Sequence, residues 1–335
     1  MANYKELEGF GVQTLATDPD SAGWVGSIFY NSTEGVFKTV KPGGIAVATW
    51  ASGGTMNTAR GSIGSAVNGT QTAGLGFGGE SPLANETKTE SYNGSSWTEV
   101  GDLNTGRGIL GGSGTQALAL AFAGNPGGGA TTDASEEFNG TSWAEGNNVN
   151  TARYGLKGSG IQTAALGFAG FNGALSPARV TLTESYNGTS WTEVGDLNTE
   201  RTSVGGFGTT QNSSICAGGN TSPGNNYTSN SESFNGTSWT ETSNLNVAKQ
   251  SMGGAGSSTN GLVFGGSTGT LQATTEAWDG TSWTEVGDLT TARQALGGLG
   301  TSTLALAFAG VTPANTAATE EWTAPDVVIN TLTTS

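Results

Sequence analysis

Trp191-Thr-Glu-Val-Gly-Asp-Leu-Asn-Thr-Glu-Arg201 is the fullest copy of an 11-residue stretch that recurs six times in this chain of 335 residues. Each copy begins with Trp, has an apolar residue six positions later, and ends with Arg or Lys ten positions after the Trp. Self-similarity at a step of 44 to 48 residues predicts a repeat architecture. The copies begin at Trp50, Trp97, Trp143, Trp191, Trp239 and Trp283, and they end at Arg60, Arg107, Arg153, Arg201, Lys249 and Arg293.

The sequence between two copies predicts short strands. After each base comes an apolar residue at plus three, and later a short apolar run that ends in Gly-Gly or Ala-Gly, such as Gly74 to Gly79. Short apolar runs between turn signals are typical of buried strands. A Glu-x-aromatic segment such as Glu90-Ser-Tyr92 then leads through Asn-Gly to the next Trp, which favours a hairpin. Each repeat is therefore predicted to form four strands, with essentially no helix.

The two ends of the repeat array are complementary. The sixth Glu-x-aromatic segment ends at Trp322 with no Trp strand after it, whereas Ile45 to Trp50 is a surplus Trp strand before the first base. Four-stranded units that pack around an axis form a β-propeller. The sequence thus predicts an all-β fold: a six-bladed propeller over residues 45–322, closed by an N-terminal outer strand.

These residues resemble the kelch family of propellers. The matching features are Gly78-Gly79, Gly218-Gly219 and Gly265-Gly266, the aromatic residue of the third strand and the Trp of the fourth. Several copies depart from the pattern with Ala-Gly, and the Asn-Gly-Thr-Ser-Trp turn is unusually uniform. The near-identical blocks look most like kelch-type propellers encoded by bacteriophages, particularly marine ones. This resemblance implies a virion structural protein, such as a tail-fibre component that binds a host receptor.

Residues 1–44 lie outside the repeat and predict a hairpin, with strands at 27–30 and 36–40. The hairpin resembles modules of phage tail-fibre and other virion proteins. An isolated hairpin is barely stable in water, and its aromatic side chains are expected to be exposed, so they need a partner. We interpret residues 1–44 as a docking segment for other virion proteins; the alternative is that it packs on the propeller's own side. Residues 323–335 are a tail in which Val327 to Ile329 can add an edge strand. The proposed docking residues are Trp24, Phe29, Tyr30 and Phe37.

Charge and composition limit the partners. The net charge is −15, from 27 acidic and 12 basic residues, which disfavours nucleic acid and anionic membranes. No apolar run of 18 residues exists, and the first residues lack a signal-peptide core. We therefore expect synthesis in a host cytoplasm followed by location in the virion. The single cysteine, Cys216, sits in an apolar run and is interpreted as an inert buried thiol.

Catalysis is not expected. The chain has no His, which removes the commonest general base and metal ligand, so we expect no enzyme activity, cofactor or metal. The 27 acidic residues are numerous enough to include a glycosidase-type pair of carboxylates, so this alternative stays open. The six repeated bases and six glutamates suggest either a charged ring or structural pairing, with Arg stacked on Trp or bonded to loop carbonyls. Their strict repetition favours the structural interpretation.

The loops between the second and third strands vary between repeats, and variation on one face of a uniform scaffold is typical of a binding surface. The third and fourth of these loops are the longest and carry Phe171, Asn172, Arg179, Asn225, Asn226 and Tyr227. Aromatic and amide groups suit a sugar, so we expect contact with a host surface glycan or protein, with a homotrimer on the particle as a further expectation. The alternatives are a capsid or tail decoration protein without its own receptor, and a cytoplasmic kelch scaffold.

Overall fold

The computed structural model describes residues 12–82, 84–175, 177–221, 226–325 and 327–332. The chain divides into two compact units. Unit 1 comprises Met1–Ala48 together with Ala324–Ser335, and unit 2 comprises Thr49–Thr323. Each unit is built from β-strands, and the only helical elements in the described residues are two 3-10 turns, η1 (Ala22–Trp24) and η2 (Ile45–Val47).

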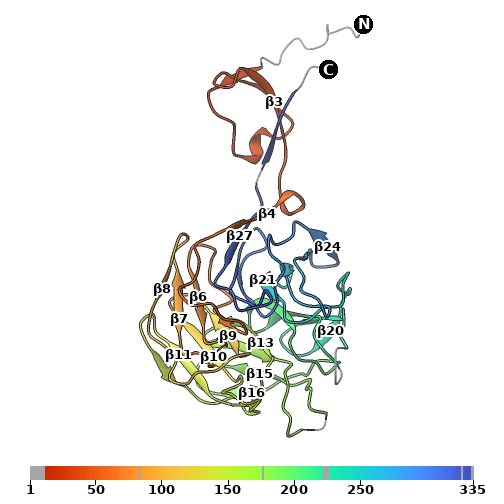
Figure 1. Ribbon diagram of the computed structural model, residues 1–335. Coiled ribbons are helices and arrows are strands. Elements are labelled where there is room, and N and C mark those ends of the chain that lie inside the picture. The colour runs from red at the N-terminus through yellow and green to blue at the C-terminus, as the bar shows by residue number, and fades with distance from the viewer. Residues whose placement is uncertain (1–11, 83, 176, 222–225, 326, 333–335) are drawn as a thin grey trace. The chain divides into compact units, whose positions relative to one another are not determined.

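Unit 2 contains, in its described part, six four-stranded antiparallel sheets, as the repeats predict. Figure 1 shows them following one another around a centre in chain order, a propeller-like arrangement. Five sheets use consecutive strands: β5 (Gly64–Ser65), β6 (Gly74–Phe77), β7 (Thr89–Tyr92), β8 (Trp97–Glu99); β9 (Gly111–Gly114), β10 (Ala119–Phe122), β11 (Ser135–Phe138), β12 (Trp143–Glu145); β13 (Lys157–Ile161), β14 (Ala164–Phe168), β15 (Thr183–Tyr186), β16 (Trp191–Glu193); β17 (Gly205–Thr210), β18 (Ser213–Ala217), β19 (Ser231–Phe234), β20 (Trp239–Glu241); and β21 (Gly253–Ser257), β22 (Asn260–Phe264), β23 (Thr275–Trp278), β24 (Trp283–Val286).

The remaining sheet combines both ends of unit 2. It contains β25 (Gly297–Gly300), β26 (Leu304–Phe308), β27 (Thr319–Thr323) and, as its fourth strand, β4 (Thr49–Ser52). Trp322 lies opposite Trp50, as Tyr92 lies opposite Trp97 within one continuous repeat. The surplus Trp strand therefore pairs where the sequence predicts. Its start differs from the prediction, because Ile45–Val47 form η2 and belong to unit 1.

The first strands of the six sheets are joined by a ring of backbone hydrogen bonds. The residue two positions after each repeated base has a positive φ of 53° to 71°. Its N–H donates to the carbonyl of the equivalent residue in the preceding repeat, at 2.7 to 2.9 Å. The Ser62 N–H completes the circle by donating to the Ala295 carbonyl. The ring members are Ser62, Ile109, Gly155, Ser203, Ser251 and Ala295.

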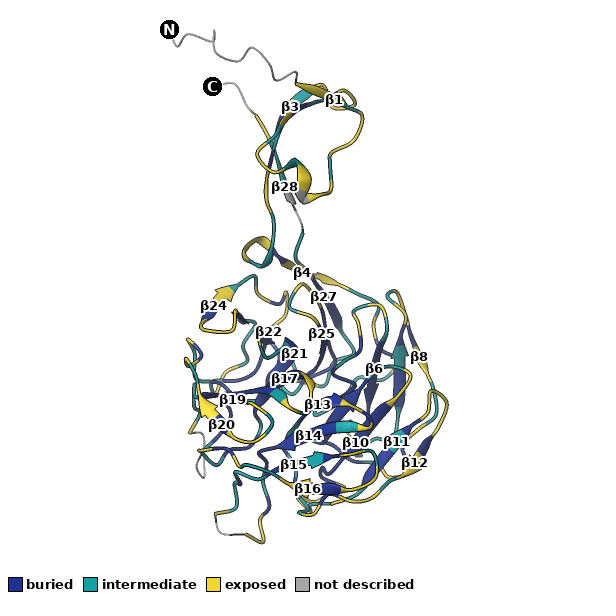
Figure 2. Ribbon diagram, turned by 180° about the vertical axis from the view of Figure 1, so that it is seen from behind, coloured by how far each residue is buried: buried dark blue, intermediate teal, exposed yellow. Residues whose placement is uncertain are grey.

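The hydrophobic core lies between adjacent sheets, because each sheet has two faces to cover. The Trp that opens a fourth strand packs against the Phe that ends the second strand of the preceding sheet, as with Trp143 and Phe77 at 4.9 Å between ring centroids. In Figure 2 the inner strands are buried and the connecting loops are exposed. One sheet differs: Ala217 occupies the Phe position, and Phe207 of the first strand supplies the ring that meets Trp283.

Unit 1 is a mixed sheet in the order β1 (Gln13–Leu15), β2 (Ile28–Asn31), β3 (Val36–Pro42) and β28 (Val327–Thr331). β2 and β3 form the predicted hairpin, and β28 adds to β3 as an antiparallel edge strand. Lys38 of β3 forms ion pairs with Asp18, in the segment after β1, at 2.7 Å and with Glu34, in the turn between β2 and β3, at 2.5 Å.

Candidate functional site

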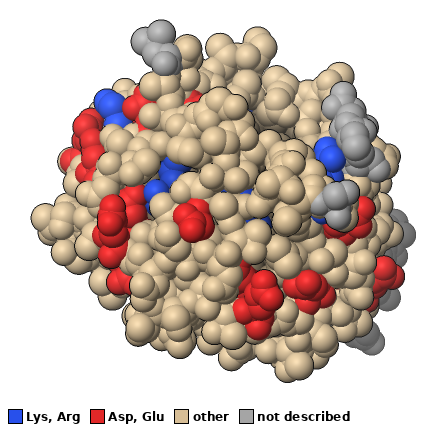
Figure 3. Space-filling model, turned by 90° about the horizontal axis from the view of Figure 1, so that it is seen from below, with Lys and Arg blue, Asp and Glu red and all other residues tan. Residues whose placement is uncertain are grey.

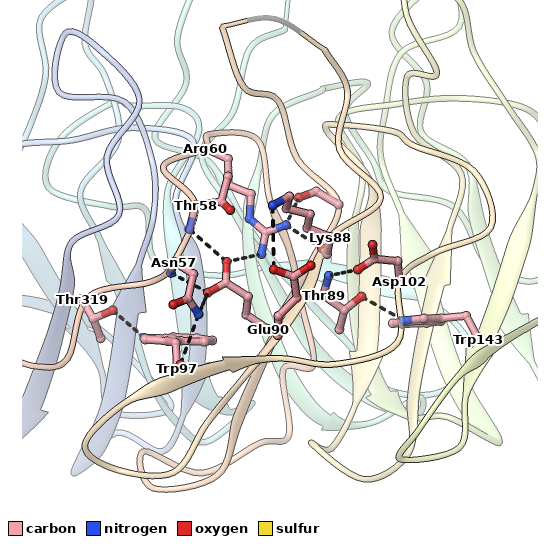
Figure 4. Close-up of polar contacts among 12 residues, drawn as sticks. Asn57, Thr58, Arg60, Lys88, Thr89, Glu90, Trp97, Asp102, Trp143 and Thr319 are labelled. Atoms are coloured by element: carbon pink, nitrogen blue, oxygen red, sulfur yellow. Dashed lines mark hydrogen bonds and ion pairs between the residues drawn. The ribbon is translucent and has the colours of Figure 1, made fainter.

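Each repeated base of unit 2 forms a buried ion pair with the glutamate of the third strand in its own sheet. Figure 4 shows one example, in which Arg60 Nη2 lies 3.0 Å from Glu90 Oε1 and Arg60 Nη1 donates to the carbonyls of Gly78 and Lys88. The side chains of all twelve residues are at most 3% exposed. The pairs are Arg60–Glu90, Arg107–Glu136, Arg153–Glu184, Arg201–Glu232, Lys249–Glu276 and Arg293–Glu320.

Each carboxylate also accepts hydrogen bonds from further donors. Glu90 Oε2 accepts from the backbone N–H of Asn57 at 2.6 Å and from its side-chain amide at 2.9 Å, and the same amide donates to the carbonyl of Trp97. This Asn is the Asn/Thr position of the sequence motif, whose role the sequence did not reveal. Burial lowers the pKa of Arg60, Arg107, Lys249 and Arg293, with their glutamate partners opposing the shift. The guanidinium groups bond to carbonyls and carboxylates, so stacking on Trp is not their role.

The tryptophans connect each sheet to the one before it. Trp143 Nε1 donates to Thr89 Oγ1 of the preceding sheet at 2.9 Å, and three other repeats contain the same bond. Where Ser replaces this Thr, the bond is absent: the indole N–H of Trp191 and Trp283 and the hydroxyl of Ser135 and Ser231 have no partner among the described residues. The γ-methyl of Thr restricts its rotamer, which explains why Thr holds the hydroxyl in place and Ser does not.

In the variable loop between β14 and β15, some of the predicted ligand-binding side chains make contacts within the protein. Phe171 stacks on Tyr154 with ring centroids 5.1 Å apart. Asn172 is buried; its side-chain amide donates to the carbonyl of Ala152 and its Oδ1 accepts from the N–H of Ala174. Both hydrogen-bonding groups of Asn172 are therefore occupied, one by the segment between β12 and β13 and one by its own loop, which disfavours direct contact between Asn172 and a ligand.

Arg179 lies in a surface groove of the same loop. The groove has a volume of about 270 Å³ and is lined by Leu175, Pro177, Arg179, Val180, Thr181, Leu182 and Glu200. Arg179 is half-buried, and Leu175 is 43% exposed. Figure 2 shows this loop projecting from the sheet of β13 to β16. A cation beside apolar side chains at a projecting loop is suited to contact with a polar or anionic ligand.

The loop between β18 and β19 holds the other predicted residues. Asn225 lies outside the described residues. Asn226 is exposed, and its amide lies 3.4 Å from Thr221 Oγ1. Tyr227 is half-buried, pairs with Asn220 in a β-bridge, and lies beside Gly269 of the following sheet's loop. Four of the predicted side chains are thus at least partly exposed on these two loops: Phe171, Arg179, Asn226 and Tyr227.

An axial cavity lies inside the backbone ring, and the sequence analysis missed it. It has a volume of about 120 Å³. Its lining comprises the second and third residues after each base, plus Lys157. A comparison of the repeats could have pointed to this cavity, because Lys157 stands at a position where the other five copies have Gly. The lining residues are Ser62, Ile63, Ile109, Leu110, Gly155, Leu156, Lys157, Ser203, Val204, Ser251, Met252, Ala295 and Leu296.

The proposed docking residues of unit 1 divide between its core and its surface. Phe29 is fully buried, so the expectation that it is exposed is wrong: alternation along β2 points it to the covered face. Trp24 and Tyr30 are half-buried, and Phe37 is 49% exposed. Tyr30 and Phe37 contact each other, with ring centroids 5.2 Å apart, and Ile28 is 51% exposed.

No protein-family model matches the chain, and neither does any curated protein. Within the described ranges, no helix is long and apolar enough to cross a membrane. The described residues also contain no cluster of three or more acidic or Cys side chains able to hold a metal ion. Figure 3 shows acidic side chains scattered over the face in view, with fewer basic ones.

Proposed function

We propose that the chain is a bacteriophage virion protein whose unit 2 is a six-bladed kelch-like propeller and binds a host surface component, a glycan in the first instance. The observation that carries this proposal is the contrast between a buried frame repeated six times and loops that differ between the repeats. A rigid scaffold that displays variable loops is suited to recognition.

The backbone ring supports six blades around one axis. The equivalent residues of the six repeats donate to one another in sequence, and the last bond joins the first repeat to the sixth. The loops themselves are linked around unit 2. The Asn85 amide donates to the carbonyl of Asn125 in the next repeat, and the Asn315 amide donates to the carbonyl of Glu80. Such bonds limit loop motion, which lowers the entropy lost when a ligand binds.

Unit 1 is the proposed attachment module. Ile28, Tyr30 and Phe37 form a partly exposed apolar cluster on one face of its sheet. A folded module with an apolar sheet face suits contact with another virion protein. The acidic net charge of −15 argues for a protein or neutral glycan partner over nucleic acid.

Two measurements test this function. The first probes gradient-purified particles of a phage that encodes the chain with an antibody against it; absence from the particle ends the virion proposal. The second applies the full-length recombinant chain to host envelope and to a glycan array. Arg179→Ala and Tyr227→Ala are expected to reduce binding at least tenfold, the size of one lost hydrogen bond to a charged group.

Thr141→Ala is the matched control, since Thr141 is exposed in the turn between β11 and β12, at the end of that sheet opposite the variable loop. Equal loss with Thr141→Ala would contradict recognition by the loops. A chain that is present on particles and binds neither envelope nor glycan is a decoration protein, and a chain absent from particles that captures a cytoplasmic protein is a scaffold.

A further inference from the structure

The axial cavity of unit 2 contains one break in the sixfold pattern, at Lys157. Four positions after the base, the other repeats have glycine for a steric reason. A Cβ at Gly111, for example, would lie 2.4 Å from the ring of Phe122. A side chain at this position is therefore tolerated only where the surroundings have been rearranged to admit it. The glycines are Gly64, Gly111, Gly205, Gly253 and Gly297.

Lys157 is the only charged side chain in the lining of this cavity. Among the described residues it has no carboxylate partner and no side-chain hydrogen bond, whereas all six repeated bases lie in buried ion pairs with glutamate. Burial lowers the pKa of Lys157 to about 8, so the amine is still protonated at neutral pH. Lys157 is half-buried, and a bound anion would supply the counter-charge that the described residues do not provide.

Hydroxyl groups share the cavity with the ammonium group. Ser203 and Ser251 belong to the backbone ring, and their hydroxyls have no hydrogen-bond partner in the described part of the chain. The hydroxyl of Ser62, also in the ring, is already bonded to Glu80 Oε2 at 3.0 Å. Lys157 and two serines whose hydroxyls have no partner among the described residues thus line one cavity.

One side chain spans the far end of the axis. Asn68 lies in the turn after β5, which is longer than the corresponding turn after β9. Its side-chain amide donates to the carbonyl of Gly160 at 3.1 Å and to that of Thr209 at 2.9 Å, in two other sheets. Gly160 lies near the end of β13, whereas Lys157 begins that strand. Asn68 therefore bridges the axis at the end of β13 opposite to Lys157.

We propose that this axial pocket binds a small monoanion, a short carboxylate such as formate or acetate. The ammonium group of Lys157 supplies the counter-charge, and the hydroxyls of Ser203 and Ser251 donate to the carboxylate oxygens. The pocket has a volume of about 120 Å³, which is enough for a small ion. Apolar neighbours such as Leu156 and Met252 suit a singly charged ion better than a strongly hydrated multivalent one. This inference is independent of the proposed binding to a host surface.

Thermal unfolding of the full-length chain tests the proposal. Formate and acetate are titrated at constant ionic strength, with gluconate as a background anion too large for the pocket. A ligand that binds only the folded state raises the melting temperature, here by about 2–4 °C at concentrations ten times the Kd. Lys157→Met removes the charge at similar size and is expected to abolish this rise. Ser203→Ala is expected to weaken binding several-fold.

Lys88→Met is the matched control, because Lys88 is a partly exposed lysine of the same unit; it should keep the full response. A rise that is equal in wild type and Lys157→Met would overturn the proposal, as would no rise with either anion. If Lys157→Met does not fold, diffraction from wild-type crystals soaked in bromide decides the question. Anomalous density beside Lys157 supports the site, and an empty pocket contradicts it.

Discussion

The ion pairs of the two units use the same chemistry in opposite surroundings. In unit 1, Lys38 bridges Asp18 and Glu34, whose side chains are 32% and 52% exposed. In unit 2, Arg60 and Glu90 are both completely buried. Water and salt screen the first set, whereas the second set depends entirely on internal donors such as Asn57. The comparison shows that a buried pair stabilises the fold only when both partners are present. With both partners it connects strands of the sheet, and without one partner it leaves an uncompensated buried charge.

The largest expected effect comes from breaking one buried pair. Glu90→Ala leaves Arg60 unpaired in the interior and removes the acceptor of Asn57, so we expect a loss of about 3–5 kcal/mol in the free energy of unfolding. Glu99→Ala is the matched control, since Glu99 lies directly opposite Glu90 on β8 but is half exposed. It should cost about 0.5 kcal/mol or less. Urea denaturation measures both, and similar losses would refute the contrast.

A second prediction concerns Lys157, a half-buried cation for which the described residues provide no carboxylate partner. The pKa of Lys157 is about 8 in the folded chain and 10.5 in its ordinary environment, so the unfolded state binds more protons between these values. Stability therefore rises with pH across this window. Relative to Lys157→Met, the wild type should gain about 1–3 kcal/mol between pH 8 and 10.5 in buffer without small anions. Urea midpoints at pH 7, 8.5 and 10 measure this, and a constant difference would contradict it.

A smaller effect is expected where a buried polar bond is missing. Ser135→Thr should let Trp191 donate to the new hydroxyl as Trp143 does to Thr89, with a gain of about 0.5–1.5 kcal/mol. Thr89→Ser is the reverse experiment and should lose a similar amount. The measurement is again the unfolding free energy, and an unchanged or lower stability of Ser135→Thr would show that the γ-methyl does not fit.

The smallest effect is expected in unit 1. Lys38 lowers the pKa of Asp18 through a hydrogen bond. The contribution of this pair is therefore present above the ordinary pKa of 3.8 and is lost as the pH falls through the lower folded value. Asp18→Asn should speed amide exchange in β3 at low salt and much less at 1 M NaCl. The deficit of Glu90→Ala should be insensitive to salt, and equal salt dependence would remove the distinction.

Local patterns predicted the strands well, and distant contacts were harder to predict. The hairpin at Asn93-Gly94 forms as expected, with Gly94 at φ 90°. The sequence also indicated structural roles for the repeated bases and glutamates, because their spacing does not vary. The burial of Phe29 was missed, since a four-residue strand with apolar residues on both faces does not show which face is covered. The burial of Asn172 was also missed, because its side-chain amide donates to Ala152 in a different connecting segment.

The chain's sequence by itself determined the number of repeats, the four strands of each repeat and the pairing of its two ends. These follow from backbone preferences and from apolar periodicity, which act over a few residues. Only the tertiary structure decided that Arg60 meets Glu90, that Asn68 closes the axis and that Lys157 enters a pocket lined by all six repeats. Such contacts join atoms far apart in the chain, and their geometry exists only once the sheets are packed around the ring.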